Sequence, residues 1–286
     1  MPVQPEAFFL PLDGDRRGQL FCLFYPAQRE SAIGSILYVH PFAEEMNKSR
    51  RMAALQARAL AQAGYAVLQV DLWGCGDSSG DFGDASWRDW VNDVVRGCHW
   101  LREHNHAPLW LWGLRAGCLL AAQASRELTE SCSFIFWAPT PAGRLVLQQF
   151  LRLKAAGDML AGNAKGVTEN LRRQLLGGEA VEVAGYSVSP ALATGLEQAA
   201  LSPPTPLEMP GEPARLEWLD LTSRADAGLS PACVKASGQW GEAGFLVGTH
   251  VVNGAAFWQT SEIEQAPELI TATVAAISKL HRSAIA

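Results

Sequence analysis

Several features that would narrow the function of this chain are missing from its sequence. Its 286 residues contain no run of the roughly 20 apolar residues that a membrane-spanning helix needs. The first residues, MPVQPEAFFLPLDGD, carry acidic groups where a secretory signal has a positive region. Charged residues make up 18%, and the 29 acidic residues outnumber the 23 basic ones, so no broad basic surface is available for nucleic acid. We therefore expect a cytoplasmic protein with no membrane span and no nucleic-acid partner.

Paired cysteine spacings are also missing. The six cysteines show no CxxC pattern, so the sequence predicts reduced thiols, with no zinc ribbon and no disulfide framework. We also expect no metal and no other cofactor. The ten tryptophans are more unusual. Several of them fall beside the motifs described below, which suggests a pocket with aromatic walls.

The chain alternates between strand-like and helix-like segments. Two strand-like runs near the start, joined by the DGDRRG turn, predict an antiparallel pair. Continuous apolar runs of the kind found in buried strands then alternate with helical patterns, which favours an α/β fold with a mostly parallel sheet covered on both faces. The expected strands are 7–12, 19–27, 35–40, 65–72, 108–114, 133–139, 214–221 and 243–252, and the expected helices of the core are 48–63, 87–103, 116–125 and 267–280.

The alternation breaks between residues 140 and 213. AGRLVLQQFLRLKAAGDMLAG and the stretch around TENLRRQLL have helical patterns, and LSPPTPLEMPGEP is rich in proline. We interpret 140–213 as a helical cap insertion with a stiff return linker. Residues 1–139 and 214–286 would then form the core.

Three turns after predicted strands carry a distinctive set of motifs. His40-Pro41-Phe42 follows one strand, DLWGCGDSSG (71–80) the next, and Gly113-Leu114-Arg115-Ala116-Gly117 the third. In open parallel sheets, ligands bind at these carboxyl ends. In this order the motifs resemble the α/β-hydrolase family, which has an HG-type oxyanion loop, a DxxGxGxS loop and the GxSxG nucleophile elbow. The resemblance covers nearly the whole chain and implies the α/β-hydrolase fold.

The resemblance places Arg115 in the nucleophile slot. Small residues at 113 and 117 allow the sharp strand-to-helix turn that presents one side chain to the site. The family has serine, cysteine or aspartate there, whereas a guanidinium that stays protonated cannot act as an acyl-accepting nucleophile. The sequence therefore predicts that ordinary serine chemistry is absent.

The other two triad slots follow from the same resemblance. The frame Gly254-Ala255-Ala256-Phe257-Trp258, followed by Glu262 and Pro267, puts Phe257 where the family has histidine. His250 lies seven residues earlier, inside a predicted strand, and replaces that histidine only if the register differs. Asp226 best matches the acid slot, with Asp220 as the second choice, and the alternative for an acid without a histidine is an ordinary surface carboxylate.

Arg115 has two possible partners at the start of a helix, where the backbone favours an anion. One is an internal acid, with Glu44, Glu45 and Asp226 as candidates, and the other is an anionic ligand. His40 either orients the oxyanion loop or is a structural histidine. The residues expected to contact a small acyl or anionic ligand are His40, Phe42, Glu44, Leu114, Arg115, Ala116 and Trp258.

Other residues near these motifs have structural explanations as well as functional ones. Cys75 and Cys118 are interpreted as buried structural thiols. Asp71 and Asp77 are interpreted as turn residues. The sequence leaves two alternatives for Trp73, Trp112, Trp137 and Trp258, which either line a pocket or pack in the core.

A narrower resemblance is carried by three segments, HPFAEEMNKSRR, WGLRAGCLLAA and NGAAFWQTSEIEQAPELI. Together they are similar to the exosortase A system-associated hydrolase of the second type, whose own pattern includes arginine in the elbow. The similarity implies a bacterial cytoplasmic protein linked to protein sorting and exopolysaccharide export, handling an acyl or thioester group.

Two functional hypotheses follow. In the first, the chain has a ligand pocket but no catalytic activity, and Arg115 either binds an anionic ligand or stabilises the structure of the site. In the second, it hydrolyses acyl esters or thioesters without a covalent intermediate, because Arg115 and backbone N–H groups polarise the carbonyl while an acid such as Asp226 or Glu44 activates water. The sequence favours the first and does not define the oligomeric state.

Overall fold

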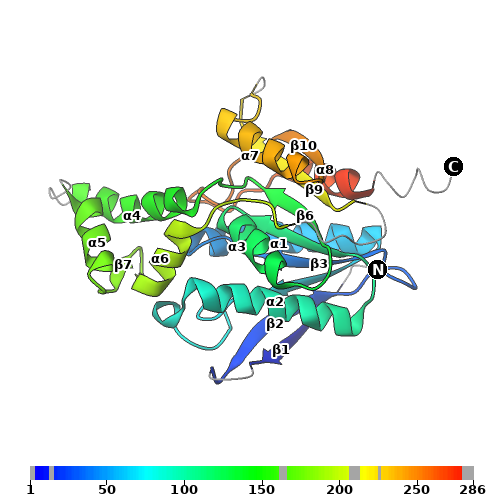
Figure 1. Cartoon of the computed structure of the whole chain (residues 1–286), viewed down its shortest axis with the longest axis horizontal. Coiled ribbons are helices and arrows are strands. Elements are labelled where there is room, and N and C mark those ends of the chain that lie inside the picture. The colour runs from blue at the N-terminus through cyan, green and yellow to red at the C-terminus, as the bar shows by residue number, and fades with distance from the viewer. Residues whose placement is uncertain (1–3, 13–15, 161–165, 206–212, 225–226, 279–286) are drawn as a thin grey trace.

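The computed structural model describes residues 4–12, 16–160, 166–205, 213–224 and 227–278, with no side-chain detail for 157–160. Within these residues the centre of the molecule is an eight-stranded sheet (Figure 1). As the sequence predicted, the β1–β2 pair is antiparallel and the sheet is mostly parallel; the β2–β4 pair is also antiparallel, and all the other neighbouring pairs are parallel. In sheet order the strands are β1 (Glu6–Pro11), β2 (Gln19–Tyr25), β4 (Tyr65–Val70), β3 (Gly34–Val39), β5 (Leu109–Leu114), β6 (Ser133–Trp137), β9 (Arg215–Thr222) and β10 (Leu246–Asn253).

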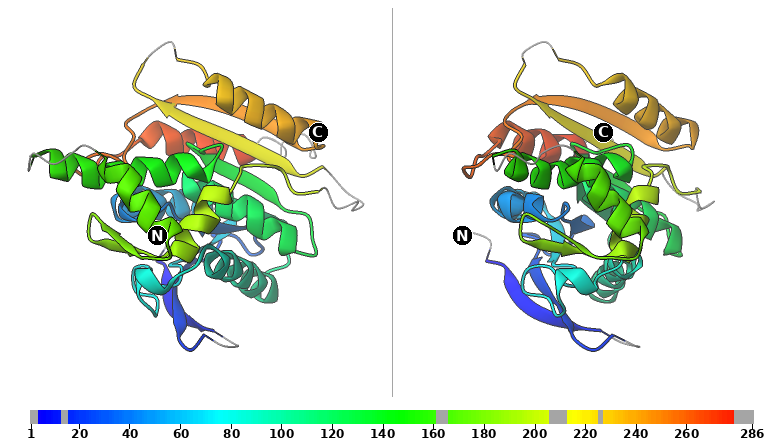
Figure 2. Two further views of the ribbon diagram at one scale, coloured as in Figure 1. Left: turned by 60° about the vertical axis from the view of Figure 1, so that its left-hand side comes forward. Right: turned by 90° about the vertical axis from the view of Figure 1, so that its left-hand side faces the viewer.

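Helices cover both faces of this sheet, and each face has its own apolar core. Every residue of β3 and β5 is buried, because these central strands have helices on both sides. Figure 2 shows the β1–β2 pair and the β9–β10 pair at opposite edges. One face packs against α1 (Glu44–Ala63) and α8 (Pro267–Ser278), and the other against α2 (Trp87–His104), α3 (Ala116–Ala124) and α7 (Pro231–Glu242), with short 3-10 turns η1 (Phe82–Asp84) and η2 (Ser125–Glu127).

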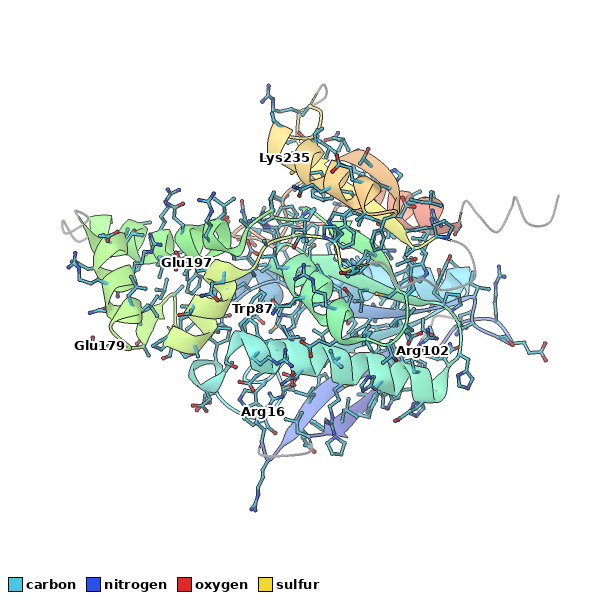
Figure 3. The ribbon with its side chains drawn as sticks, in the orientation of Figure 1. Arg16, Trp87, Arg102, Glu179, Glu197 and Lys235 are labelled. Carbon is cyan, nitrogen blue, oxygen red and sulfur yellow. The ribbon has the colours of Figure 1, made fainter. Side chains whose placement is uncertain are left out.

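An insertion, defined here as 140–213, connects β6 to β9. A β-bridge joins Ala142, near its start, to Ala200, which follows its last described helix. One of its helices packs so closely on α2 that a Cβ on Gly195 would lie 2.2 Å from Cβ of Trp87, which Figure 3 labels. The described elements of the insertion are α4 (Gly143–Leu160), α5 (Val167–Leu176), β7 (Val181–Val183), β8 (Tyr186–Val188) and α6 (Pro190–Gln198).

Some elements differ from the prediction. Helix α1 begins at Glu44 and not at Lys48, because the carbonyls of Phe42 and Ala43 already accept hydrogen bonds from Glu45 and Met46. Two acidic residues in this first turn also suit the positive end of the helix dipole.

Two helices were missing from the prediction. Both begin with serine followed by proline: Ser189 caps α6, whose first residue is Pro190, and Ser230 caps α7, whose first residue is Pro231. A capping serine before an N1 proline is a known start signal, so the sequence did contain the information. Among the described helices, none is both long and apolar enough to cross a membrane.

Candidate active site

A single residue, Arg115, joins β5 to α3 and has a strained backbone. Its φ of 54° and ψ of −116° lie outside the regions that residues with a side chain prefer. The turn is fixed by hydrogen bonds from the Arg115 N–H to the Trp137 carbonyl at 3.0 Å and from the Cys118 N–H to the Arg115 carbonyl at 3.1 Å. The sharp strand-to-helix turn expected from the sequence is therefore present.

Glycines on either side of Arg115 allow this turn to pack. A Cβ on Gly113 would lie 2.6 Å from backbone atoms of Cys118. A Cβ on Gly117 would lie 2.2 Å from the carbonyl oxygen of Val39 in β3. Backbone atoms cannot rotate away as a side chain can, so both positions exclude any larger residue.

The Arg115 side chain is held by three partners from different parts of the chain. Its Nε lies 3.4 Å from Oε1 of Glu45, and its Nη2 donates to Oε1 of Gln149 at 2.9 Å. The guanidinium carbon also lies 5.6 Å from the ring centre of Trp258, a cation–π geometry. Of the two partners considered from the sequence, the structure thus shows an internal acid, and the acid is Glu45.

Glu45 is a buried carboxyl in the first turn of α1. Its pKa is raised to about 7, chiefly by burial, with Arg115 lowering it and the neighbouring Glu44 raising it. Glu44 also has a raised pKa, chiefly because of burial. The Oε2 atoms of both carboxyls are buried and have no hydrogen-bond partner in the described part of the chain.

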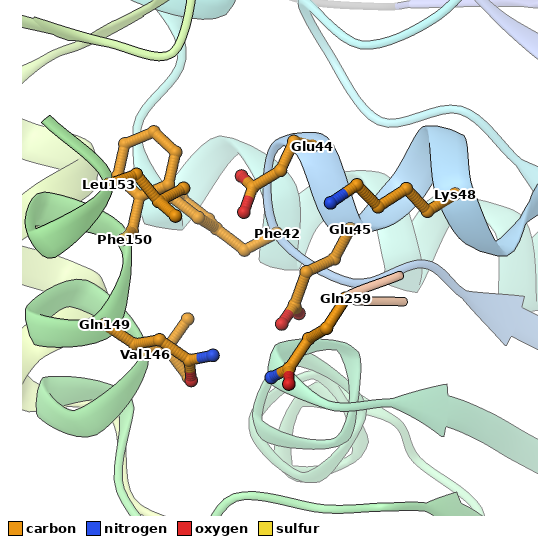
Figure 4. A pocket seen from close by; sticks show the side chains of 9 residues that line it. All are labelled: Phe42, Glu44, Glu45, Lys48, Val146, Gln149, Phe150, Leu153 and Gln259. Carbon is orange, nitrogen blue, oxygen red and sulfur yellow. The ribbon is translucent and has the colours of Figure 1, made fainter. Parts of the chain in front are cut away.

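These two carboxyls line a pocket of about 220 Å³ between the start of α1 and the insertion helix α4 (Figure 4). The α1 side of the pocket is polar, whereas α4 supplies mainly apolar side chains and one amide, that of Gln149. The residues that line it are Phe42, Glu44, Glu45, Lys48, Val146, Gln149, Phe150, Leu153 and Gln259.

The pocket contains part of the predicted set of ligand contacts. Phe42 and Glu44 line it. Leu114, Ala116 and Trp258 are buried and are not among its lining residues, nor is Arg115, which lies against Glu45 and Gln149. Glu45 was expected only as an ion-pair candidate, and Lys48, Gln149 and Gln259 were not expected at the site, because no local sequence pattern shows which segments pack against the start of α1.

His40 has the bonding pattern of a structural histidine. Its Nδ1 lies 2.8 Å from the Pro41 carbonyl, and its Nε2 lies 3.3 Å from the Leu72 N–H. Nδ1 therefore donates and Nε2 accepts, which requires a neutral ring. Burial lowers the His40 pKa and favours the same neutral form.

Phe257 is fully buried, with its ring 6.2 Å from that of Trp137 and 5.1 Å from that of Trp258. Asp226 lies outside the described residues. Asp220, the second choice for the acid, is in β9, and its pKa is raised mainly by burial while Arg115 lowers it. Its Oδ1 accepts a hydrogen bond from the Leu221 N–H at 3.1 Å.

His250 lies within β10, as the sequence indicated. Its Nε2 is 2.8 Å from Oε2 of Glu217, and the other oxygen of Glu217 bonds Arg215. Arg215 in turn donates to the carbonyls of Ala276 and Ile277 at the end of α8. This cluster joins the sheet to a helix and gives His250 a structural partner.

The remaining motif residues have structural contacts. Oδ2 of Asp71 accepts a hydrogen bond from the Asp77 N–H at 3.1 Å, which stabilises the turn as expected, and it also pairs with Arg50 at 2.8 Å. Trp112 and Trp137 are fully buried in the core. Trp73 is partly buried under Arg16, and none of the four tryptophans considered from the sequence lines the pocket.

All six cysteines are buried, and burial raises the pKa of each thiol, to about 12 for Cys22 and Cys132. We expect iodoacetamide at neutral pH to leave the folded protein unlabelled and to label all six thiols after unfolding, because the thiolate is the reacting form. Mass spectrometry of both samples measures this. Fast labelling of Cys75 or Cys118 in the folded protein would contradict the structural interpretation.

The mostly parallel sheet, the helices on both faces and the strained turn between β5 and α3 define an α/β-hydrolase fold. The family described as serine aminopeptidase, S33, matches residues 30–192, which is more than half of the chain. The chain belongs to this family. No curated protein matches the sequence.

Solved structures with this fold include esterases and lipases. Est1E from Butyrivibrio proteoclasticus, solved with ferulic acid, is 14% identical with a TM-score of 0.67, over 96% of this chain and 98% of that one. A carboxyl esterase from Bacillus coagulans, solved with glycerol, is 13% identical with a TM-score of 0.63, over 98% and 99%. A soluble variant of monoglyceride lipase from Saccharomyces cerevisiae, in complex with a substrate analog, is 14% identical with a TM-score of 0.60, over 98% and 96%. At such low identity these similarities establish the fold alone.

Proposed function

We propose that this chain binds a small ligand with an acyl or alkyl chain in the pocket between α1 and α4, and that it does not use a covalent serine-type mechanism. The observation that carries this proposal is the position of Arg115. It occupies the strained turn at the start of α3, and Glu45, Gln149 and Trp258 hold its guanidinium. An arginine does not lose its proton in proteins and cannot accept an acyl group.

The lining of the pocket supports an acyl ligand over an anionic one. Glu44 and Glu45 line it and would repel an anion, while the guanidinium of Arg115 is already paired with Glu45. The opposite wall, with Val146, Phe150 and Leu153, is apolar. The volume of about 220 Å³ is below the roughly 300–1,000 Å³ of typical ligand pockets, which favours a small ligand.

The proposal also covers the three catalytic-triad positions and the cellular role of the protein. In it, Arg115, Phe257 and Asp226 occupy the nucleophile, histidine and acid positions of a degenerate triad, and residues 140–213 form a cap over a core of 1–139 and 214–286. A role in a bacterial exosortase A and exopolysaccharide system, in the cytoplasm, rests on the sequence resemblance alone.

Binding of octan-1-ol, measured by isothermal titration calorimetry, tests the proposal. We expect the wild type to bind it, and Leu153→Gln to weaken binding about fivefold, because Leu153 is exposed at the pocket and covering part of a leucine side chain with a ligand contributes about 1 kcal/mol. Leu176→Gln is the control, since Leu176 is exposed on the insertion and does not line the pocket. Absence of wild-type binding, or equal binding by both variants, would contradict the proposal.

Measurements of ester and thioester hydrolysis test the proposal that the chain is not catalytic. With p-nitrophenyl octanoate and octanoyl-CoA, we expect the wild type to be no faster than Arg115→Ala. Robust hydrolysis that disappears in Arg115→Ala would show that Arg115 takes part in a reaction.

One observation favours a second candidate function, ester or thioester hydrolysis without a covalent intermediate. Glu45 has a pKa of about 7 and a free Oε2, and it lies beside a permanent cation. In this scheme Glu45 takes a proton from water, the hydroxide attacks the carbonyl, Arg115 stabilises the oxyanion, and the alcohol or thiol leaves with the proton that Glu45 returns. Hydrolysis that rises through pH 7 and is lost in Glu45→Gln would support it.

A further inference from the structure

The pocket contains two hydrogen-bond acceptors that nothing in the described chain satisfies. These are Oε2 of Glu44 and Oε2 of Glu45. The Glu45 side chain is 8% exposed, and its carboxyl points into the pocket in Figure 4. A buried acceptor without a donor is unfavourable, and more so when it is charged. The apolar wall opposite offers no donor.

The two buried atoms of this pocket without a partner are both carboxylate oxygens. Lys48, Gln149 and Gln259 also line the pocket, and among the described residues neither oxygen is hydrogen-bonded to any of them. A ligand that places a hydrogen-bond donor between the two carboxyls would therefore satisfy atoms that the described chain leaves unsatisfied.

We propose that the ligand carries a protonated amine, which binds between Glu44 and Glu45 while its hydrocarbon chain lies along α4. This inference rests on the proposed function and names the head group of its ligand.

An ammonium group fits this place better than a hydroxyl or a carboxylate. One ammonium has three N–H donors on a single atom, so it reaches both carboxyls, whereas a single hydroxyl donates only once. Its charge also relieves the repulsion between Glu44 and Glu45, which contributes to the raised pKa of Glu45. A carboxylate would add a third negative charge.

Lys48 is the cation of the chain that competes for this position. It lines the pocket one turn further along α1, yet neither free Oε2 is hydrogen-bonded to it. The charged groups that face Glu45 are Glu44 and Lys48 from α1 and Arg115 from the start of α3, while α4 contributes the neutral Gln149.

Calorimetric titration with three probes of equal chain length tests the head group. At pH 8 we expect wild type to bind octylamine at least tenfold more tightly than octan-1-ol, and octanoate more weakly than either. Glu44→Gln should reduce the preference for the amine over octan-1-ol to less than threefold. Glu182→Gln, which replaces an exposed carboxyl on β7, is the matched control and should keep the preference.

Two further measurements separate this head-group site from simple attraction to an acidic surface. Lys48→Met should tighten octylamine binding, because it removes the competing cation. Octylamine should bind more tightly at pH 8 than at pH 6, since Glu45 loses its proton near pH 7 while an alkylammonium stays charged.

The outcomes distinguish this inference from the proposed function. If octylamine and octan-1-ol bind wild type equally, the amine inference is wrong and the proposed function stands. If neither binds, the proposed function is wrong as well. If Glu44→Gln and Glu182→Gln reduce the preference equally, the amine does not bind between Glu44 and Glu45. Glu44 is only partly buried, so Glu44→Gln leaves the buried Glu45–Arg115 pair intact.

Discussion

Gly117→Ala is expected to destabilise the folded protein by about 3 kcal/mol or more. The new Cβ would lie 2.2 Å from the carbonyl oxygen of Val39 and 2.8 Å from that of His40, so β3 or α3 has to move. Overpacking of this kind typically costs about 1–3 kcal/mol, and here the obstructing atoms are backbone. The gain in helix propensity, about 1 kcal/mol, offsets only part of it. Urea denaturation measures the difference.

Gly238→Ala is the matched control. Gly238 is an exposed residue in α7, and a Cβ there would meet no atom within 4 Å. Its replacement should be neutral or stabilise the protein by up to about 1 kcal/mol through helix propensity. If Gly117→Ala is as stable as Gly238→Ala, the packing of the turn around Arg115 is not as described.

Glu45→Gln is expected to remove a large part of the pH dependence of stability. In the folded protein the Glu45 pKa is about 7, raised from an ordinary 4.5. Between these values the folded state keeps a proton that the unfolded chain has lost, so the free energy of unfolding falls as pH rises through this window. A shift of this size corresponds to about 3 kcal/mol between pH 4.5 and pH 7. A glutamine side chain does not titrate, so the substitution removes this contribution.

Urea denaturation of wild type and Glu45→Gln at pH 5 and pH 8 checks this prediction. Other groups also titrate: His40, with a lowered pKa, contributes the opposite slope below its ordinary pKa, and Glu44 has a raised pKa. They are present in both proteins, so the difference between the two slopes isolates Glu45. Equal slopes in the two proteins would mean that Glu45 is ionised throughout this range. Glu182→Gln should retain the wild-type slope.

The order of strands and helices could be predicted because it depends on local patterns. Apolar runs such as 35–40 and 108–114 are typical of buried strands, and the small residues at 113 and 117 indicate the turn around Arg115. The start of α1 was placed late because Glu44 to Asn47 gives little apolar periodicity. The helices after Ser189 and Ser230 were missed although the capping signal was present.

The contacts of the candidate site were less predictable than the fold. Glu45 is 70 positions from Arg115 in the sequence, and Gln149 is 34 positions away. Which of Glu44, Glu45 and Asp226 meets Arg115 depends on how α1 packs against α3, and that packing is a tertiary property. The position of α4 beside α1 is tertiary as well, so the pocket could not be derived from either segment alone.

The two walls of the pocket come from different segments of the chain. Glu44 and Glu45 stand on a helix that packs directly on the central sheet, whereas Val146, Phe150 and Leu153 stand on an insertion that is closed on itself by the Ala142–Ala200 bridge. Substitutions at Val146, Phe150 or Leu153 can therefore change the apolar wall while Gln149, the α4 residue that bonds Arg115, stays in place. Related proteins could diversify in the tail of their ligand while keeping the chemistry of its head.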